Sequence, residues 1–317
     1  MHKIFIILFL LLATAFISGC SNKPKLTDLP TRLETIPTSS AKMTPTKDKL
    51  PPILHSNQWH KPVPLAKEVN SAGGEDSAFI MPNGNTLYFF FTPNVKIPAQ
   101  KQVLDKVTGI YVSKKIDGKW TEAKRVMLQK NKKLALDGCG FVQNGYIWFC
   151  SAREGYTGLH WFKAELGENQ HRNWQVIEGK FTDYQVGELH INSTGNRLYF
   201  HSDRPGGAGQ YDIWVSEKQN DIWQQPVNIK IINSPETDGW PFVNEDETQI
   251  WFTRTYKGSP AIFRSVKKDG QWQKPELILS QFAGESSLDN SGNIYFTHHY
   301  YNNDGMIEAD IYVAYKK

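Results

Sequence analysis

Five segments of the chain repeat one pattern of apolar and polar positions. Each has a short strand-like run, a tight turn containing Gly, Asn or acidic residues, and a second run rich in aromatic side chains; the segments are 78–89, 139–149, 189–200, 241–252 and 286–296. Turn residues between two apolar runs predict a β-hairpin, because Gly and Asn tolerate positive φ. A third strand-like run follows each hairpin, and in four repeats a fourth run begins at a Trp: Trp120, Trp174, Trp223 or Trp272.

Repeated units of four strands at this spacing predict an all-β fold, a five-bladed β-propeller with four antiparallel strands per blade. The last repeat lacks its own fourth strand. The missing strand is found near the N-terminus, where Trp59–Pro62 matches Trp223–Pro226 and Trp272–Pro275. We therefore expect the N-terminal strand to pair into the last blade and close the ring, with the propeller spanning residues 54–317.

The third repeat carries a family resemblance. Phe200–Gly207, read together with Asp212–Trp214, resembles the TolB-type (WD-like) propeller repeat of bacterial envelope proteins. The resemblance extends more loosely over the other four repeats. It implies a propeller fold and a place in the cell envelope, but no particular reaction, because propellers host many functions.

The first twenty residues predict export and lipid anchoring. Lys3 precedes an apolar run from Ile4 to Phe16, which is too short to span a bilayer and is typical of a signal peptide over residues 1–19. Ile17–Cys20 resembles a bacterial lipobox, so we expect the mature chain to begin at an acylated Cys20 that attaches it to a membrane. In a Gram-negative host, Ser21 favours the outer membrane.

Residues 20–53 are rich in Pro, Thr, Ser and Lys and show no apolar periodicity, which predicts a disordered tether. The net charge of +4 is concentrated there. The remaining chain is close to neutral, so no nucleic-acid partner is expected.

An acidic residue stands at the start of every predicted inner strand: Asp76, Asp137, Glu188, Asp238 and Glu285. In a propeller these starts converge on the mouth of the central channel, so the carboxylates are expected to face one funnel, with His190 pointing the same way. Arg153 and Arg204 follow two of the second strands. They are candidates for binding an anionic ligand there, or for tying one blade to the next.

Three of these acids are also candidate catalytic residues. Five-bladed glycosidases of the arabinanase and xylosidase type carry Asp, Asp and Glu on the inner strands of blades one to three, and Asp76, Asp137 and Glu188 match that order. Glycoside hydrolysis needs one protonated and one ionised carboxyl group. The alternative is structural, because TolB-type repeats commonly place an acid here to bind backbone amides of the neighbouring blade.

Two further features concern Cys and His. Cys139 and Cys150 flank the Asn144-Gly145 turn symmetrically, which places them within reach of a disulfide in an exported protein. His298 and His299 are adjacent in a strand and point to opposite faces, so they are not expected to chelate a metal together. No metal site and no cofactor is predicted.

The sequence thus favours a lipid-anchored envelope propeller that binds a protein or glycan ligand at its central funnel. One alternative is a surface glycoside hydrolase with the Asp/Asp/Glu set. Another is a non-catalytic envelope scaffold.

Overall fold

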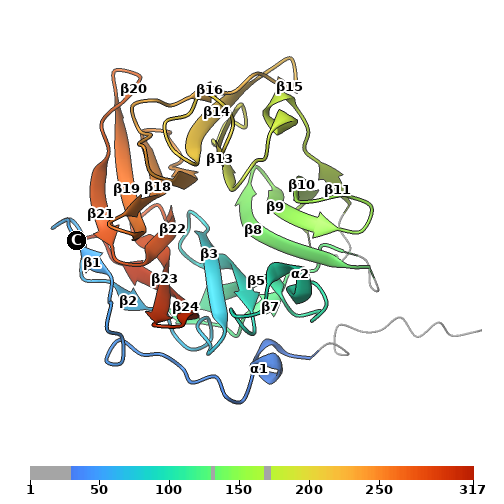
Figure 1. The fold of residues 1–317 in the computed structure, drawn as a ribbon, viewed down its shortest axis with the longest axis vertical. Helices are drawn as coiled ribbons and strands as arrows, with labels where there is room; N and C mark the ends of the chain where they lie inside the picture. The colour runs from blue at the N-terminus through green and yellow to red at the C-terminus, as the bar shows by residue number, and fades with distance from the viewer. Residues whose placement is uncertain (1–29, 130–132, 168–172) are drawn as a thin grey trace, which may run out of the picture.

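The computed structural model describes residues 30–129, 133–167 and 173–317. Within these residues, hydrogen bonding forms four sheets, and one parallel bridge, between Ala309 and Gly74, joins two four-stranded units into the largest of them. The units are arranged around a common axis (Figure 1). The predicted all-β propeller is confirmed. Cys20 and the predicted signal peptide lie outside the described residues.

Each unit runs from an inner strand at the axis to an outer strand at the rim. The first two units are β3 (Gly74–Ile80), β4 (Thr86–Thr92), β5 (Gly109–Ile116) and β7 (Lys124–Arg125), and then β8 (Ala135–Gln143), β9 (Tyr146–Arg153), β10 (His160–Glu165) and β11 (Trp174–Val176). The third is β12 (Leu189–Ile191), β13 (Arg197–Ser202), β14 (Asp212–Gln219) and β16 (Val227–Asn228). The last two are β17 (Asp238–Val243), β18 (Gln249–Tyr256), β19 (Ser259–Lys268) and β21 (Glu276–Ser280), and then β22 (Ala283–Leu288), β23 (Ile294–Asn302), β24 (Gly305–Ala314) and β2 (Val63–Pro64).

Several short strands and helical turns lie outside these four-stranded units. Three two-residue strands extend the hairpins of β5, β14 and β19: β6 (Lys119–Trp120), β15 (Ile222–Trp223) and β20 (Gln271–Trp272). The helical turns are α1 (Arg32–Thr35), α2 (Ala99–Gln102) and a 3₁₀ turn over Lys180–Asp183. No helix in the described ranges is long and apolar enough to cross a membrane.

The chain closes its ring as the sequence predicts. β2 pairs antiparallel with β24, with Val63 opposite Val313, and Trp59 forms an isolated bridge with Lys316. The Trp59 indole N–H donates to the carbonyl of Gly292 at 2.8 Å. The N-terminal strand therefore completes the last blade and covers an edge that would otherwise be unpaired.

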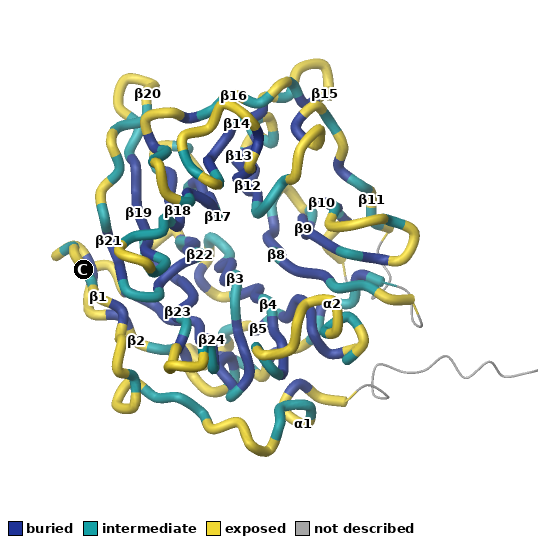
Figure 2. The backbone as a smooth tube through the Cα atoms, viewed as in Figure 1, coloured by how far each residue is buried: buried dark blue, intermediate teal, exposed yellow. Residues whose placement is uncertain are grey.

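Aromatic side chains of the inner strands and their partners fill the core. Buried residues lie along the strands toward the inside of the ring, whereas the loops at the rim are exposed (Figure 2). Between neighbouring blades the rings meet edge to face, as Trp59 and Trp251 do at 5.7 Å between centroids. Such pairs add about 0.5–1.5 kcal/mol beyond the burial of their area.

The N-terminal strap, residues 30–53, departs from the prediction of a disordered tether. It runs along the outside of the ring from α1 past β24 to β1 (Ile53–Leu54), and β1 pairs with β21 of the fourth blade (Figure 1). Ile36 and Met43 of the strap pack against the core, and its other anchors are charged. Arg32 pairs with Glu75 at 3.0 Å, Lys42 with Glu308 at 2.5 Å, and Asp48 with His298 at 2.8 Å. Because single charged residues spaced along the strap produce no apolar periodicity, the sequence pattern could not predict that the strap docks on the propeller.

Arg32 occupies a place that other blades fill with an arginine of their own. Its guanidinium lies 5.4 Å from the centroid of Phe91, much as Arg153 lies over Phe149 in the second blade and Arg254 over Phe252 in the fourth. The strap thus supplies the first blade with a cation that its own strands lack.

Candidate functional site

A repeated β-bulge shapes the inner strands at one end of the channel. The register shifts once in β3, β8, β17 and β22, and the bulged residues have positive φ: Ser77 (49°), Cys139 (52°), Trp240 (53°) and Glu285 (53°). Counted from the turn that follows, Glu188 takes the same place in the third blade. A bulge redirects its side chain, and these five side chains converge on one small cavity of about 50 Å³. We call this end the first mouth.

The hydroxyl of Ser77 links two carboxyl groups at the first mouth. Its Oγ donates to Glu188 Oε1 at 3.0 Å and lies 2.9 Å from Glu285 Oε2, and the Ser77 backbone N–H also binds Glu285 at 3.0 Å. The side chains of Cys139 and Trp240 line the same cavity as Glu188 and act to lower its pKa. Residues from all five blades therefore hold the two acids against each other.

Asp76 and His299 stand beside this pair. His299 Nε2 lies 3.7 Å from Asp76 Oδ1, and the Asp76 side chain is 31% exposed. Ligand atoms of Asp76, Glu285 and His299 all fall within 4.8 Å of one another, so these three residues have the spacing of a metal-binding set. No described lysine or arginine forms an ion pair with Asp76, Glu188 or Glu285, in contrast to the paired carboxylates elsewhere in the fold.

The environment pushes the pKa values of the three acids apart. Burial, reinforced by the nearby charge of Asp76, raises the pKa of Glu188 to about 7. Burial together with the charges of Asp76 and Glu188 raises the pKa of Glu285 well above its usual range. Burial acts on Asp76 too, but its interaction with the nearby His299 outweighs that effect and lowers the Asp76 pKa. At neutral pH the first mouth thus holds an ionised Asp76 beside a protonated Glu285 and a Glu188 that is protonated in about half of the molecules.

Asp137 does not reach the first mouth, which corrects the predicted catalytic set. It is buried and accepts hydrogen bonds at 2.6 Å from both Arg153 Nη2 and Ser151 Oγ. The two-residue turn of the second blade is shorter than the others, so counting back from the turn glycine misplaces Asp137 by one residue. Its true equivalents are Glu75 and Asp238, two residues before the bulge.

Asp238, Arg153 and Arg204 also have partners within the fold, although Arg204 binds a backbone carbonyl and not an acid. Asp238 is buried and binds Arg254 Nε at 2.5 Å and Ser234 at 2.7 Å. Arg153 is held by Asp137, and Arg204 donates to the carbonyl of Phe181 at 2.6 Å. The predicted ligand-binding roles of Asp238, Arg153 and Arg204 at the funnel find no support in these positions.

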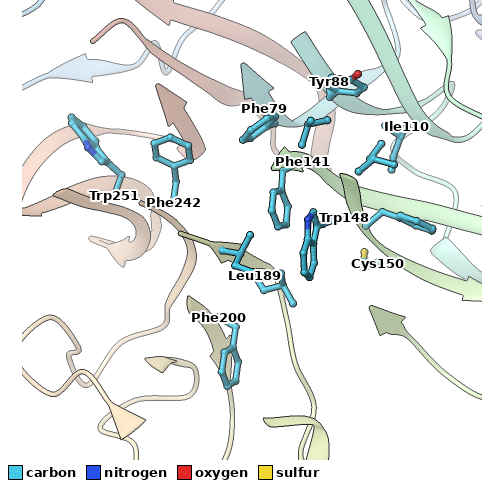
Figure 3. Close-up of a cluster of buried hydrophobic side chains, with 14 of the residues drawn as sticks. Phe79, Tyr88, Ile110, Phe141, Trp148, Cys150, Leu189, Phe200, Phe242 and Trp251 are labelled. Carbon is cyan, nitrogen blue, oxygen red and sulfur yellow. The ribbon is translucent and has the colours of Figure 1, made fainter. Parts of the chain in front are cut away.

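His190 packs one layer below the acids and also lines the small cavity of the first mouth. Its ring packs among Phe79, Phe141 and Phe242, with centroid distances of 6.1, 4.9 and 4.8 Å. Figure 3 shows the three Phe side chains pointing toward one another from β3, β8 and β17. This aromatic layer closes the channel beneath the first mouth.

The sequence missed Ser77, Trp240 and His299 as members of the site. Ser77 and Trp240 share a positional signal, because each stands seven residues before the turn residue with positive φ, as Glu188 and Glu285 do. The sequence analysis considers His298 and His299 only as a pair of metal ligands, and their side chains do point apart. His298 binds Asp48 of the strap, whereas His299 lies near Asp76.

Cys139 and Cys150 meet across the hairpin of the second blade as free thiols, with 2.9 Å between their sulfurs. We expect a small-molecule disulfide such as oxidised glutathione to convert them to an intramolecular disulfide, with release of two reduced thiols. The bridge should raise the free energy of unfolding by about 2–3 kcal/mol. Thiol titration of residues 30–317, which contain only these two cysteines, checks the prediction. Two titratable thiols after exposure to the oxidant would contradict it.

Comparison with known proteins bears on the fold. No family model matches the chain, and no curated protein shows significant sequence similarity to it. Among solved structures, the catalytic domain of the GH62 α-L-arabinofuranosidase of Coprinopsis cinerea is similar with a TM-score of 0.53 and 6% identity, over 84% of this chain and 98% of that one. The α-L-arabinofuranosidase of Podospora anserina has a TM-score of 0.49 and 9% identity, over 82% and 97%. GH43B of Bacteroides ovatus has a TM-score of 0.48 and 11% identity, over 80% and 54%.

Proposed function

We propose that the chain is a glycoside hydrolase whose acid–base groups are Glu188 and Asp76 at the first mouth. The observation that carries the proposal is a cluster of carboxyl groups without a neutralising lysine or arginine among the described residues. Glycosidic bond cleavage needs a protonated carboxyl group for the leaving oxygen and an ionised one to activate water or attack the sugar. Glu188 has the raised pKa of the acid, and Asp76 has the lowered pKa of the base or nucleophile.

Glu285 replaces Asp137 as the third carboxyl group of this site. It shares the Ser77 hydroxyl with Glu188 and lies near Asp76, so its charge state affects both. In the protonated form it donates a hydrogen bond rather than adding a further negative charge. Trp240, at the equivalent bulge of the fourth blade, lines the same cavity as Glu188 and acts to lower its pKa.

The competing function is a binding module that uses the same mouth without turnover. The test is to incubate purified residues 30–317 with arabino- and xylo-oligosaccharides and peptidoglycan fragments, and to measure both reducing-end release and binding. Release of reducing ends supports the hydrolase. Saturable binding without release over days supports the binding module and overturns the hydrolase.

We also propose that the propeller is exported and held at a membrane by acylated Cys20, as the lipobox-like Ile17–Cys20 and the TolB-type repeats suggest. In a bacterial host, the full chain should partition into the detergent phase and gain the mass of a lipid-modified cysteine. The Cys20→Ser chain should show neither the lipid mass nor cleavage before residue 20. Processing of that variant at the same bond would contradict lipoprotein maturation.

A further inference from the structure

The channel has a second mouth at the end where the inner strands turn back. It opens into a cavity of about 610 Å³, lined by the hairpin turns of all five blades. That volume is within the usual range of small-ligand sites. The aromatic layer of Phe79, Phe141, His190 and Phe242 separates it from the first mouth.

His190, which lies between this cavity and the small cavity of the first mouth and lines both, carries a hydrogen-bond donor without a partner. His190 lines the cavity and is 6% exposed, and its Nδ1 accepts the backbone N–H of Val243 at 3.3 Å. Nδ1 is therefore unprotonated, and Nε2 carries the proton of the neutral ring. Nε2 is buried and has no hydrogen-bond partner among the described residues. A buried donor left unpaired is costly, and an oxygen acceptor from a ligand would relieve that cost.

The aromatic floor suits a ring with an apolar face. Phe79 and Phe242 line the cavity on either side of His190. C–H groups of a saturated ring pack well on aromatic faces, and the polar groups that line such a site set the orientation.

The charge of the rim narrows the class of ligand. The carboxylates of Glu245, Asp246 and Asp289 line the cavity, and no Lys or Arg does. Hydrogen bonds from Thr248 to Asp246, and from Ser291 and Asn293 to Asp289, fix two of them in place. An anion is repelled by this rim. An ammonium group suits the rim but has only donors, so it cannot satisfy the N–H of His190.

We propose that the second mouth binds an uncharged carbohydrate of one or two sugar rings. A hydroxyl or ring oxygen accepts from His190 Nε2, other hydroxyls donate to the rim carboxylates, and the C–H face rests on Phe79 and Phe242. This site lies at the opposite end of the channel from Glu188, so it stands whether or not the first mouth is catalytic.

The test is saturation-transfer NMR and calorimetry on the full chain in detergent, with xylose and xylobiose as probes. Glucuronate and glucosamine serve as anionic and cationic probes of similar ring size. His190→Phe removes the donor. Asn290→Trp places a bulky ring at the exposed edge of the cavity without touching the core, and Glu188→Gln tests the other mouth.

We expect saturable binding of the neutral sugar that falls at least tenfold in both His190→Phe and Asn290→Trp and is unchanged in Glu188→Gln. Absence of neutral-sugar binding overturns the proposal, as does equal or tighter binding of glucuronate. Binding that survives Asn290→Trp but is lost in Glu188→Gln places the sugar at the first mouth, which overturns this inference and supports the proposed function. Because Asn290 is exposed, its variant remains informative even if His190→Phe fails to fold.

Discussion

Glu188→Gln should reduce glycan turnover by about 10²–10⁴-fold, the range for loss of a general acid. Gln keeps the size of the side chain and can still accept a hydrogen bond from Ser77. It cannot deliver a proton to the leaving oxygen. Reducing-end release at saturating substrate measures the effect. The wild-type rate should also fall as pH rises above about 7, because Glu188 then loses its proton.

The same substitution should stabilise the fold at pH 8. Burial raises the pKa of Glu188 to about 7 from its usual value of 4.5. The folded state therefore holds this proton more tightly than the unfolded state does, and the wild-type protein loses stability as pH rises between those two values. Gln does not ionise and avoids that loss. The melting temperature of Glu188→Gln should exceed that of the wild type at pH 8, and the gap should narrow toward pH 5.

Glu178→Gln is the matched control, because Glu178 is exposed and lines neither the first-mouth nor the second-mouth cavity. It should change neither turnover nor the pH dependence of melting. Full activity in Glu188→Gln would remove Glu188 from catalysis. A lower melting temperature at pH 8 would show that Glu188 acts as a structural acid.

Arg32→Ala should lower the free energy of unfolding by about 3–5 kcal/mol, as expected when one partner of a buried ion pair is removed. Both partners are buried: the side chain of Arg32 is 2% exposed and that of Glu75 is 0% exposed. Arg32 also donates to the carbonyls of Val69 at 2.5 Å and Glu68 at 3.0 Å. Its loss leaves an uncompensated carboxylate and unpaired carbonyls under the strap. Urea unfolding of residues 30–317 measures the change.

Two variants distinguish the stability lost with the ion pair from the stability lost by any change in the strap. Lys49→Ala changes an exposed strap residue and should cost less than about 0.5 kcal/mol. Adding Glu75→Gln to Arg32→Ala should recover part of the loss, because the buried charge is then absent. Equal unfolding midpoints for Arg32→Ala and wild type would show that the strap is not docked in solution.

The propeller could be predicted because its signals are local and repeated. Each hairpin turn and each aromatic run predicts a strand from only a few neighbouring residues. Counting the strands in each repeat shows that the last repeat lacks one, and the Trp59–Pro62 match supplies it, which predicts the ring closure. The strap could not be predicted in this way. Arg32, Lys42 and Asp48 are single charged residues in a Pro- and Thr-rich stretch, and the side chains with which they form ion pairs lie from 43 to 268 residues away in the chain.

The candidate site was predicted in part. Asp76, Glu188 and Glu285 do gather at one mouth, as the position of acids before the inner strands indicated. Asp137 does not, because a one-residue difference in turn length moves it to the position that pairs with an arginine. The bulges decide which side chain faces the axis, and positive φ at residues such as Cys139 and Trp240 has no clear sequence signal. His190 was expected beside Glu188, but it points into the next layer of the channel.

The most direct test of the acid–base site is the titration of Glu188 itself. Carboxyl-¹³C NMR of residues 30–317 with labelled glutamate, assigned by comparison with Glu188→Gln, reports its protonation across the pH range. A midpoint near 7 that moves down when Asp76 is replaced by Asn is the result expected from burial beside a negative charge. A midpoint near the ordinary 4.5, insensitive to Asp76, would contradict the site and the function proposed for it.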